Sequence, residues 1–299
     1  IARALHRLGK WKHAIAEFEK AGEIARRHKV KVGVMTNFEH AHSCLRDSAQ
    51  SGKAVATLIL AGVKDLDIHI NNFRPKSGQD YHPAETMTEH GRRIWLYQAS
   101  QMISVLSRIL DDSVSLAQAG KEAVQENLFR AFVRVADLLE TVGQFAQSDD
   151  LLARVINIWP DDPRGYVMRG AILGKWFDAT RNDGALIDRS VEAAQKGGSL
   201  AENVDHPENI KKQAGQIIDN AVRYLFNAAD ACAAQGRFEQ AKFWLTQGTR
   251  IVPDEEDFWC VLTYVELAMG HIEDAKAAYS HLNRIARTKT DHRTRQLKT

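Results

Sequence analysis

Apolar residues along this chain recur every three or four positions, the spacing that places them on one face of an α-helix. No stretch shows the sustained alternation of apolar and polar residues that is typical of a strand. Proline lacks a backbone N–H and does not fit inside a regular helix, so its positions mark helix ends. Each proline lies where one periodic segment ends or the next begins, at positions 75, 83, 160, 163, 207 and 253. The pattern therefore predicts an all-α chain.

A series of residues recurs after four of the glycines. A large apolar residue follows two positions later, a small residue five positions later and another large residue nine positions later. The series begins at Gly143 and Gly236, where a proline seventeen positions later completes it, and at Gly9 and Gly270, where that proline is missing. The distance from Gly236 to Gly270 is 34 residues. The sequence thus contains a helical repeat, uneven in quality.

Each part of the series has a structural meaning. Glycine at the end of a first helix adopts the left-handed conformation that lets the chain reverse. The small residue lets the second helix approach the first closely, and the large residues fill the space between pairs. Proline ends the second helix and begins the next pair. One pair cannot bury its apolar stripe alone, so several pairs must stack to form a continuous core.

This pattern resembles the tetratricopeptide repeat family in four segments, which together make up 91 of the 299 residues. The resemblance implies a right-handed α-solenoid of antiparallel helix pairs, about six or seven in number, with irregular central units. Members of the family often bind extended peptides along the concave face, which the first helices line. The four segments are ALHRLGKWKHAIAEFEKA (4–21), ADLLETVGQFAQSDDLLARVINIWPDDP (136–163), AADACAAQGRFEQAKFWLTQGTRIVPDEE (228–256) and LAMGHIEDAKAAYSHL (267–282).

The repeats vary along the chain, and we predict four divisions. Residues 1–70 form N-terminal repeats, the first of them truncated. Residues 71–83 form a loop, because they hold two prolines, a glycine and two asparagines. Residues 84–287 continue the helical repeats, with an irregular, turn-rich insertion at 181–209. The polar and basic residues 288–299 form a frayed tail.

One subgroup of the family grips the C-terminal carboxylate of chaperones with Lys, Asn and Arg at fixed groove positions. The equivalent positions here hold no such cation or asparagine, and aspartates at two of them would repel a carboxylate. We therefore predict that these units do not bind chaperone tails. The groove suits a basic or neutral ligand, unless its aspartates simply pair with arginines such as Arg134. The candidate partner contacts are Val133, Asp137, Phe226, Asp230 and Tyr264, with Cys260 at a further groove position.

Other clusters of reactive residues give no complete site. His40, His42 and Cys44 lie within five residues, but only His40 and Cys44 share a helix face, and zinc needs about four converging ligands. Residues 80–93 combine histidines, acids and arginines in a pattern typical of a helix start, so we predict a structural junction or a partner-binding loop there rather than catalysis. Residues 51–55 lack the earlier glycine and the Ser/Thr of a phosphate loop. We predict no catalytic residue, no cofactor and no metal.

The charge balance argues against a dedicated nucleic-acid binder. Lys plus Arg number 40 and Asp plus Glu number 38, a net charge of +2, and the pI of 8.4 is below the value of about 9 that is usual for such domains. Two basic clusters, residues 25–31 and 283–298, keep an RNA-associated role as an alternative, although neither contains interleaved aromatic residues. We expect the tryptophans beside the repeat positions to be packing residues; they are Trp159, Trp176, Trp244 and Trp259.

An extended helical surface without a catalytic set favours a non-catalytic scaffold or adaptor subunit of a larger assembly, which binds protein partners. The alternatives are a regulatory or RNA-associated helical-repeat protein and the repeat region of a larger enzyme, since the chain opens at Ile1 inside a repeat. The longest uncharged apolar run, 54–63, is shorter than the roughly 20 residues of a membrane span. Three widely separated cysteines favour an intracellular, reducing compartment; they are Cys44, Cys232 and Cys260.

Overall fold

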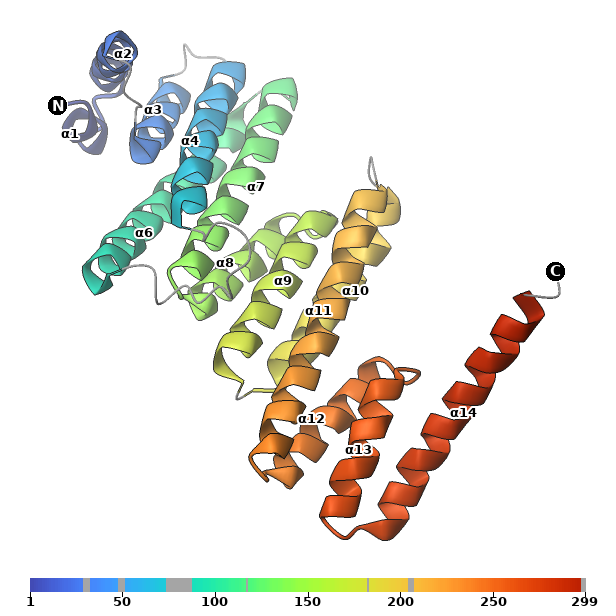
Figure 1. Cartoon of the computed structure of the whole chain (residues 1–299). Coiled ribbons are helices and arrows are strands. Elements are labelled where there is room, and N and C mark those ends of the chain that lie inside the picture. Colours follow the sequence, from blue (N-terminus) through green and yellow to red (C-terminus); the bar gives the residue numbers. More distant parts are fainter. Residues whose placement is uncertain are drawn as a thin grey trace. The chain divides into compact units, whose positions relative to one another are not determined.

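The computed structural model describes residues 1–28, 33–47, 52–73, 88–116, 118–181, 183–203 and 207–296. Every regular element in these ranges is helical, so the prediction of an all-α chain is confirmed (Figure 1). The chain divides into two compact units, residues 1–161 (unit 1) and residues 162–299 (unit 2). Within the described residues, no helix is long and apolar enough to cross a membrane.

Unit 2 is a regular succession of helices. Each helix packs against the next one in the chain, and α9 also packs against α11. The core is centred on Phe177, Trp244 and Phe258, with the rings of Phe177 and Trp244 5.2 Å apart. Trp244 is thus a packing residue, as expected. The helices are α9 (Pro163–Thr180), α10 (Ala185–Leu200), α11 (Pro207–Ala234), α12 (Phe238–Ile251), α13 (Glu256–Ala268) and α14 (Ile272–Gln296), with a 3-10 turn, η2 (Ala201–Asn203), after α10.

Unit 1 begins and ends with helix pairs of the expected kind. α1 packs against α2, α3 against α4, and α7 against α8. One long helix, α6, lies between the second and third pairs in the chain. The helices are α1 (Ala2–Arg7), α2 (Trp11–Arg27), α3 (Val34–Arg46), α4 (Gly52–Phe73), α6 (Glu89–Asp112), α7 (Gln118–Thr141) and α8 (Phe145–Ile158), with a 3-10 turn, η1 (Ser113–Ser115), after α6.

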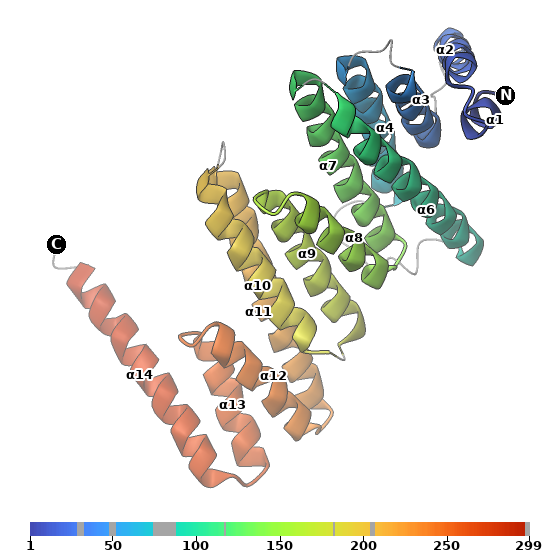
Figure 2. The same cartoon turned by 180° about the vertical axis from the view of Figure 1, so that it is seen from behind.

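The middle of unit 1 departs from a simple succession of pairs. α4 packs along α7, and α6 packs against both α3 and α7. The first turns of α4 and α7 meet at Gly52 and Gly120, where a Cβ added to Gly52 would lie 2.6 Å from the Gly120 Cα, so side chains at this point would keep the helices apart. Figure 1 shows α4 and α7 in front of α6, and Figure 2 shows α6 in front of them. Four helices therefore pack around one another here.

The predicted role of the repeat glycines is confirmed. Gly9, Gly143, Gly236 and Gly270 all have a positive φ, between 70° and 80°. Each follows the first helix of a pair, where the left-handed conformation lets the chain turn into the second helix. The small residue five positions later also acts as expected, since the Ser148 hydroxyl donates to the Ala136 carbonyl at 2.7 Å and holds α8 close to α7.

The predicted divisions compare with the structure as follows. We expected a loop from residue 71, whereas α4 continues to Phe73; residues 74–83 of that loop lie outside the described residues. Within the insertion at 181–209, α10 occupies 185–200, and residues 182 and 204–206 lie outside the described residues. We expected the tail to fray from residue 288, whereas α14 continues to Gln296, because this stretch contains neither glycine nor proline to end it.

Candidate partner-binding surface

On α7 the predicted groove aspartate is closed to solvent. Val133 is half-buried and Asp137 is only 3% exposed. The Arg134 guanidinium binds the Asp137 carboxylate at 3.2 Å and the Asp67 carboxylate of α4 at 2.7 Å. Asp137 therefore pairs with Arg134, which was one of the two alternatives in the sequence analysis. As a result, α7 offers no free carboxylate at this position.

On α11 and α13 the equivalent positions are open. Tyr264 is 61% exposed, Asp230 and Cys260 are exposed, and Phe226 is half-buried. The Phe226 ring packs edge-on against the Phe258 ring at 5.7 Å, which joins the two helices beneath this surface. We call the surface formed by Phe226, Asp230, Cys260, Tyr264 and Leu267 the inner surface of unit 2. Of the five predicted contacts, Asp230 and Tyr264 are therefore exposed and Phe226 is half-buried.

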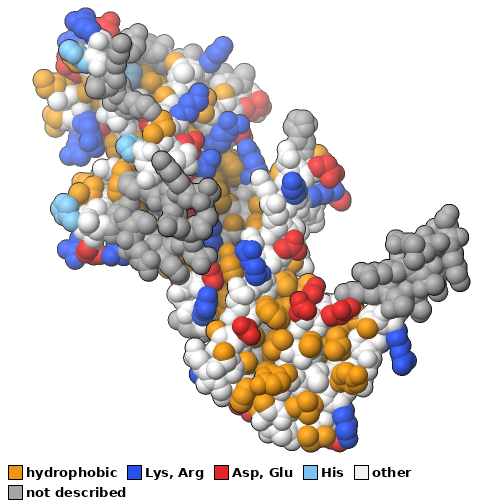
Figure 3. All heavy atoms as spheres, viewed as in Figure 1, with side chains coloured by type: hydrophobic (Ala, Val, Ile, Leu, Met, Phe, Trp, Pro, Cys, Tyr) orange, Lys and Arg blue, Asp and Glu red, His pale blue; other side chains and the backbone are white. Residues whose placement is uncertain are grey.

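The inner surface combines apolar side chains with uncompensated negative charge. Leu267, one helical turn beyond Tyr264, is also exposed. Figure 3 shows hydrophobic side chains gathered over α11 and α13 in the lower part of the view. Asp230 and Asp257 are exposed and form no ion pair with any described residue. Since Asp257 also lies in the first turn of α13, its charge complements the helix dipole as well.

A cluster that the sequence did not single out surrounds Lys242 of α12. Its ammonium lies 2.7 Å from the buried Glu266 carboxylate of α13 and 3.5 Å from Asp274 of α14, and His271 lies 3.0 Å from Glu266. A hydrogen bond to Glu266 raises the Lys242 pKa. Glu266, His271 and Asp274 have the residue types of a metal site. Because the Lys242 ammonium lies within reach of both carboxylates, the cluster is an ion-pair network that links three helices.

This network gives a test of stability. We expect Lys242→Met to lower the free energy of unfolding of unit 2 by about 1–3 kcal/mol, because the buried Glu266 carboxylate loses its cation. Lys276→Met is the matched control, since Lys276 pairs with the exposed Glu273 at 2.8 Å. The control should change stability by no more than about 0.5 kcal/mol. Urea denaturation measures both, and equal effects of the two variants would contradict the buried role of Glu266.

The histidines and cysteine considered for zinc do not converge. The His40 ring stacks on Phe18 at 5.3 Å, whereas His42 bonds to His6 at 2.9 Å and to Asp112 at 3.0 Å. Burial raises the pKa of the Cys44 thiol to about 12, so the thiolate that binds metals is disfavoured. The three cysteines at 44, 232 and 260 are all free thiols. The sequence did not predict the partners of His42, because His6 and Asp112 lie far from it in the chain.

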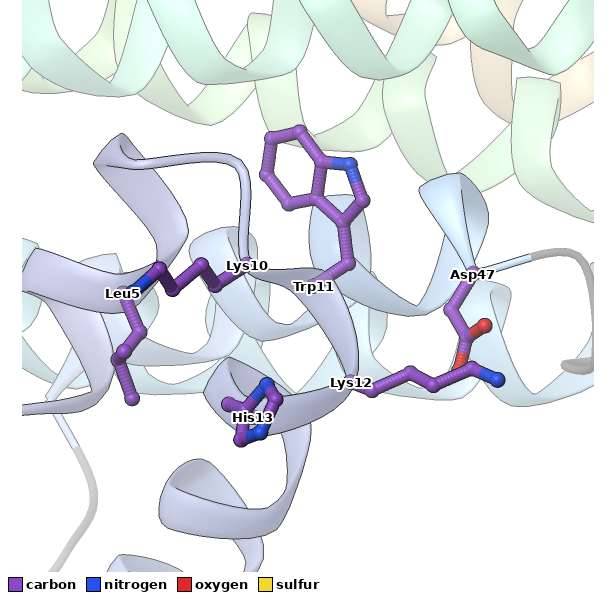
Figure 4. A pocket seen from close by; sticks show the side chains of 6 residues that line it. All are labelled: Leu5, Lys10, Trp11, Lys12, His13 and Asp47. Carbon is purple, nitrogen blue, oxygen red and sulfur yellow. The ribbon is translucent and has the colours of Figure 1, made fainter.

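A pocket of about 470 Å³ lies beside the turn between α1 and α2 (Figure 4). Figure 4 shows the Lys12 side chain extended toward Asp47, while Lys10 extends toward Leu5. Its lining side chains are all exposed or half-buried, so no buried polar group is available to select a ligand. The full lining is Leu5, Lys10, Trp11, Lys12, His13 and Asp47.

The remaining predicted clusters lie partly beyond the described residues. In the junction at 80–93, residues 80–87 are not described, and Thr88 caps α6 by accepting a hydrogen bond from the Gly91 amide at 3.1 Å. Residue 51 and residues 29–31 of the first basic cluster are also outside the described part. In the second basic cluster, Arg284 and Arg287 are exposed on α14.

Sequence comparison identifies one repeat directly. A family model described as Tetratricopeptide repeat matches residues 222–255, which cover the end of α11 and all of α12. No curated protein matches the chain. The matched segment contains Gly236 and the series that follows it, so the family model recognises one of the two predicted repeats that are complete.

Solved structures with a distant likeness include helical proteins of different kinds. BtubC from P. vanneervenii is 11% identical, with a TM-score of 0.33, 87% of this chain covered and 93% of that chain. A human IFIT1 dimer with PPP-AAAA is also 11% identical, with a TM-score of 0.24, 95% of this chain covered and 81% of that chain. A MamA RS-1 double mutant is 10% identical, with a TM-score of 0.25, 66% of this chain covered and 96% of that chain. The family match, the glycine turns and the packed helix pairs together show that this chain has a tetratricopeptide-like helical-repeat architecture.

Proposed function

We propose that this protein is a non-catalytic scaffold subunit that holds partner proteins, and that unit 2 binds an extended segment of a partner along its inner surface. Tetratricopeptide repeats in general mediate protein–protein interactions. The observation that carries the proposal is that α13 exposes the apolar side chains of Tyr264 and Leu267, while α11 exposes the Asp230 carboxylate, which pairs with no described cation.

The chemistry of this surface selects the kind of segment. Exposed aromatic and aliphatic side chains gain free energy when a partner covers them. Asp230 forms no ion pair with a cation among the described residues, so a lysine or arginine of the partner would complete its ion pair. Asp137 of unit 1 differs because Arg134 already neutralises it. We therefore propose that the partner segment is apolar and basic.

Selection from a random peptide library displayed on phage tests this proposal. We expect enriched peptides to carry Lys or Arg next to an aromatic or aliphatic residue. Tyr264→Ser should weaken the binding of an enriched peptide by about tenfold, because it removes the largest exposed side chain of the surface. Fluorescence anisotropy with the labelled peptide measures the affinity.

A matched control exists in unit 1. Tyr97 of α6 is 62% exposed, nearly the same as Tyr264, but it lies outside the inner surface. Tyr97→Ser should leave the affinity unchanged, and Asp230→Lys should reduce the binding of basic peptides. Enrichment of acidic peptides, or equal effects of the two tyrosine variants, would contradict the proposal.

A further inference from the structure

A second cavity of unit 1, of about 430 Å³, lies where α3 packs against both α2 and α4. Its volume is within the range of about 300–1,000 Å³ that small-ligand sites occupy. Glu19, Gly22 and Glu23 of α2 line it together with Asn37 and His40 of α3. We call this cavity the α2–α3 pocket. Unlike the pocket in Figure 4, it is lined by a buried polar side chain, that of Asn37.

The carboxamide of Asn37 has an acceptor to spare. Asn37 is only 8% exposed, and its Nδ2 donates to the Asp65 carboxylate of α4 at 3.0 Å. A carboxylate only accepts hydrogen bonds, so the nitrogen of the carboxamide must face Asp65. The Asn37 oxygen then accepts no hydrogen bond from any described residue, although this buried side chain lines the pocket. Because a buried acceptor without a donor costs free energy, this oxygen favours a ligand that carries N–H groups.

The charge of the α2–α3 pocket is negative. Glu19 and Glu23 lie one turn apart on the same face of α2, and neither forms an ion pair with a described residue. The described lining includes no lysine and no arginine. Burial lowers the pKa of His40, against the opposing effect of Glu19, so its imidazole is neutral at pH 7. The pocket therefore combines two carboxylates and a carboxamide oxygen without a cation to balance them.

We propose that the α2–α3 pocket binds the guanidinium of an arginine side chain that a partner protein inserts into it. A guanidinium has five N–H donors and no acceptor, which complements a pocket whose polar groups are mainly acceptors. It is also planar and stacks on flat rings, and the His40 ring is held in place because it stacks on Phe18 at 5.3 Å. This site lies in unit 1 and does not depend on the extended segment proposed for the inner surface of unit 2.

Three blocked amino acids test the chemistry of the ligand. They are the N-acetyl methylamides of arginine, lysine and citrulline, and saturation-transfer NMR measures their binding to the whole chain. We expect saturable binding of the arginine compound with a millimolar Kd, because a single side chain makes all the contacts. The lysine compound should bind at least about threefold more weakly, since an ammonium is a compact charge with fewer donors. Citrulline has nearly the shape of arginine without its charge and should not bind measurably.

Gly22→Leu tests the place of binding without a change of charge. A Cβ added to Gly22 meets nothing within 4 Å, and leucine favours a helix, so the chain should fold as before. The leucine side chain would occupy the pocket and weaken the binding of the arginine compound by at least about tenfold. Gly215→Leu is the matched control, since a Cβ at Gly215 of α11 also meets nothing within 4 Å but lies outside the pocket. It should leave the affinity unchanged.

Glu19→Gln tests the charge of the pocket without a change of shape. It should weaken the binding of the arginine compound by about tenfold, because a charge-assisted hydrogen bond becomes a neutral one. Glu239→Gln is the matched control, since Glu239 is exposed on α12 and the net charge of the chain changes equally. It should leave the affinity unchanged.

Four results would each overturn the proposal. They are the absence of saturable arginine binding, equal binding of citrulline, binding that Gly22→Leu does not reduce, and binding that Glu19→Gln and Glu239→Gln reduce equally. Agmatine, which is arginine without its carboxyl group, is the probe for a free small molecule. If it bound at least about tenfold more tightly than the blocked arginine, the ligand would be a free guanidinium compound and not the side chain of a partner. Tyr264→Ser should leave all these affinities unchanged, so failure of this pocket is distinct from failure of the inner surface.

Discussion

Gly248→Ala should destabilise unit 2 by about 1–3 kcal/mol, although the same substitution in the interior of a helix normally stabilises it. The added methyl would lie 2.1–2.5 Å from three ring carbons of Phe258, well inside van der Waals contact. Phe258 is 1% exposed and also packs against Phe226, so its ring cannot simply turn away. The clash must therefore separate α12 from α13 or displace the core around the ring.

Gly215→Ala is the control for this prediction. Gly215 lies inside α11, and a Cβ added there meets nothing within 4 Å. Both substitutions change the backbone entropy of the unfolded chain equally, so Gly215→Ala should stabilise the protein by about 0.5–1 kcal/mol. Urea denaturation, with amide hydrogen exchange of α13 as the local probe, measures the two variants. A Gly248→Ala protein at least as stable as the wild type would show that the close approach of α12 and α13 is not required.

The parts of the fold that local sequence determines were predictable. The four repeat glycines predict left-handed turns, because no other residue adopts that conformation as readily. All four have a positive φ in the structure. The resemblance to the repeat family predicted Tyr264 and Asp230 as groove residues, and both side chains are exposed in the structure. The position of the turn between the two helices of a pair therefore follows from spacing where the repeat is intact.

The middle of unit 1 was not predictable in this way. The contact of α4 with α7 depends on Gly52 and Gly120, which lie in different helices and belong to no repeat series. Phe38 fits against Gly62 for a similar reason, since a Cβ at Gly62 would lie 2.5 Å from its ring. Such contacts arise from the three-dimensional packing of side chains of matching size, and one sequence gives no local signal for them. Asp137 and Asp230 occupy equivalent repeat positions, yet Asp137 is buried and Asp230 is exposed. The repeat spacing does not predict this difference.

Acidification should destabilise unit 1 through a buried chain of hydrogen bonds that links α1, α3 and α6. The Asp112 carboxylate only accepts, so His42 Nε2 donates to it at 3.0 Å, and His42 Nδ1 then accepts from His6 Nε2 at 2.9 Å. His6 Nδ1 is buried without a hydrogen-bond partner, which suits a neutral imidazole with a bare lone pair. Both imidazoles must therefore be neutral for the chain of bonds to persist.

The surrounding charges reinforce this requirement. Burial lowers the pKa of His6 to about 4, aided by repulsion from His42, Arg108, Arg7 and Arg3. Burial also lowers the pKa of His42, against the opposing effect of its bond to Asp112. Between pH 6.5 and pH 4 the unfolded chain binds protons that the folded chain does not, so stability falls as the pH falls. His6 alone should remove about 3 kcal/mol by pH 4, and none of its contribution is lost above pH 6.5.

The variant that separates this cause from general acid sensitivity is His6→Gln. Glutamine keeps an N–H donor for His42 Nδ1 but has no proton to gain in this range, so the slope of unfolding free energy against pH should decrease. His13→Gln, at an exposed position on α2, should leave the slope as it is in the wild type. Urea midpoints between pH 7 and pH 4.5 give the comparison. If His6→Gln lost stability with acid as steeply as the wild type did, protonation of His6 would not be the cause of the loss.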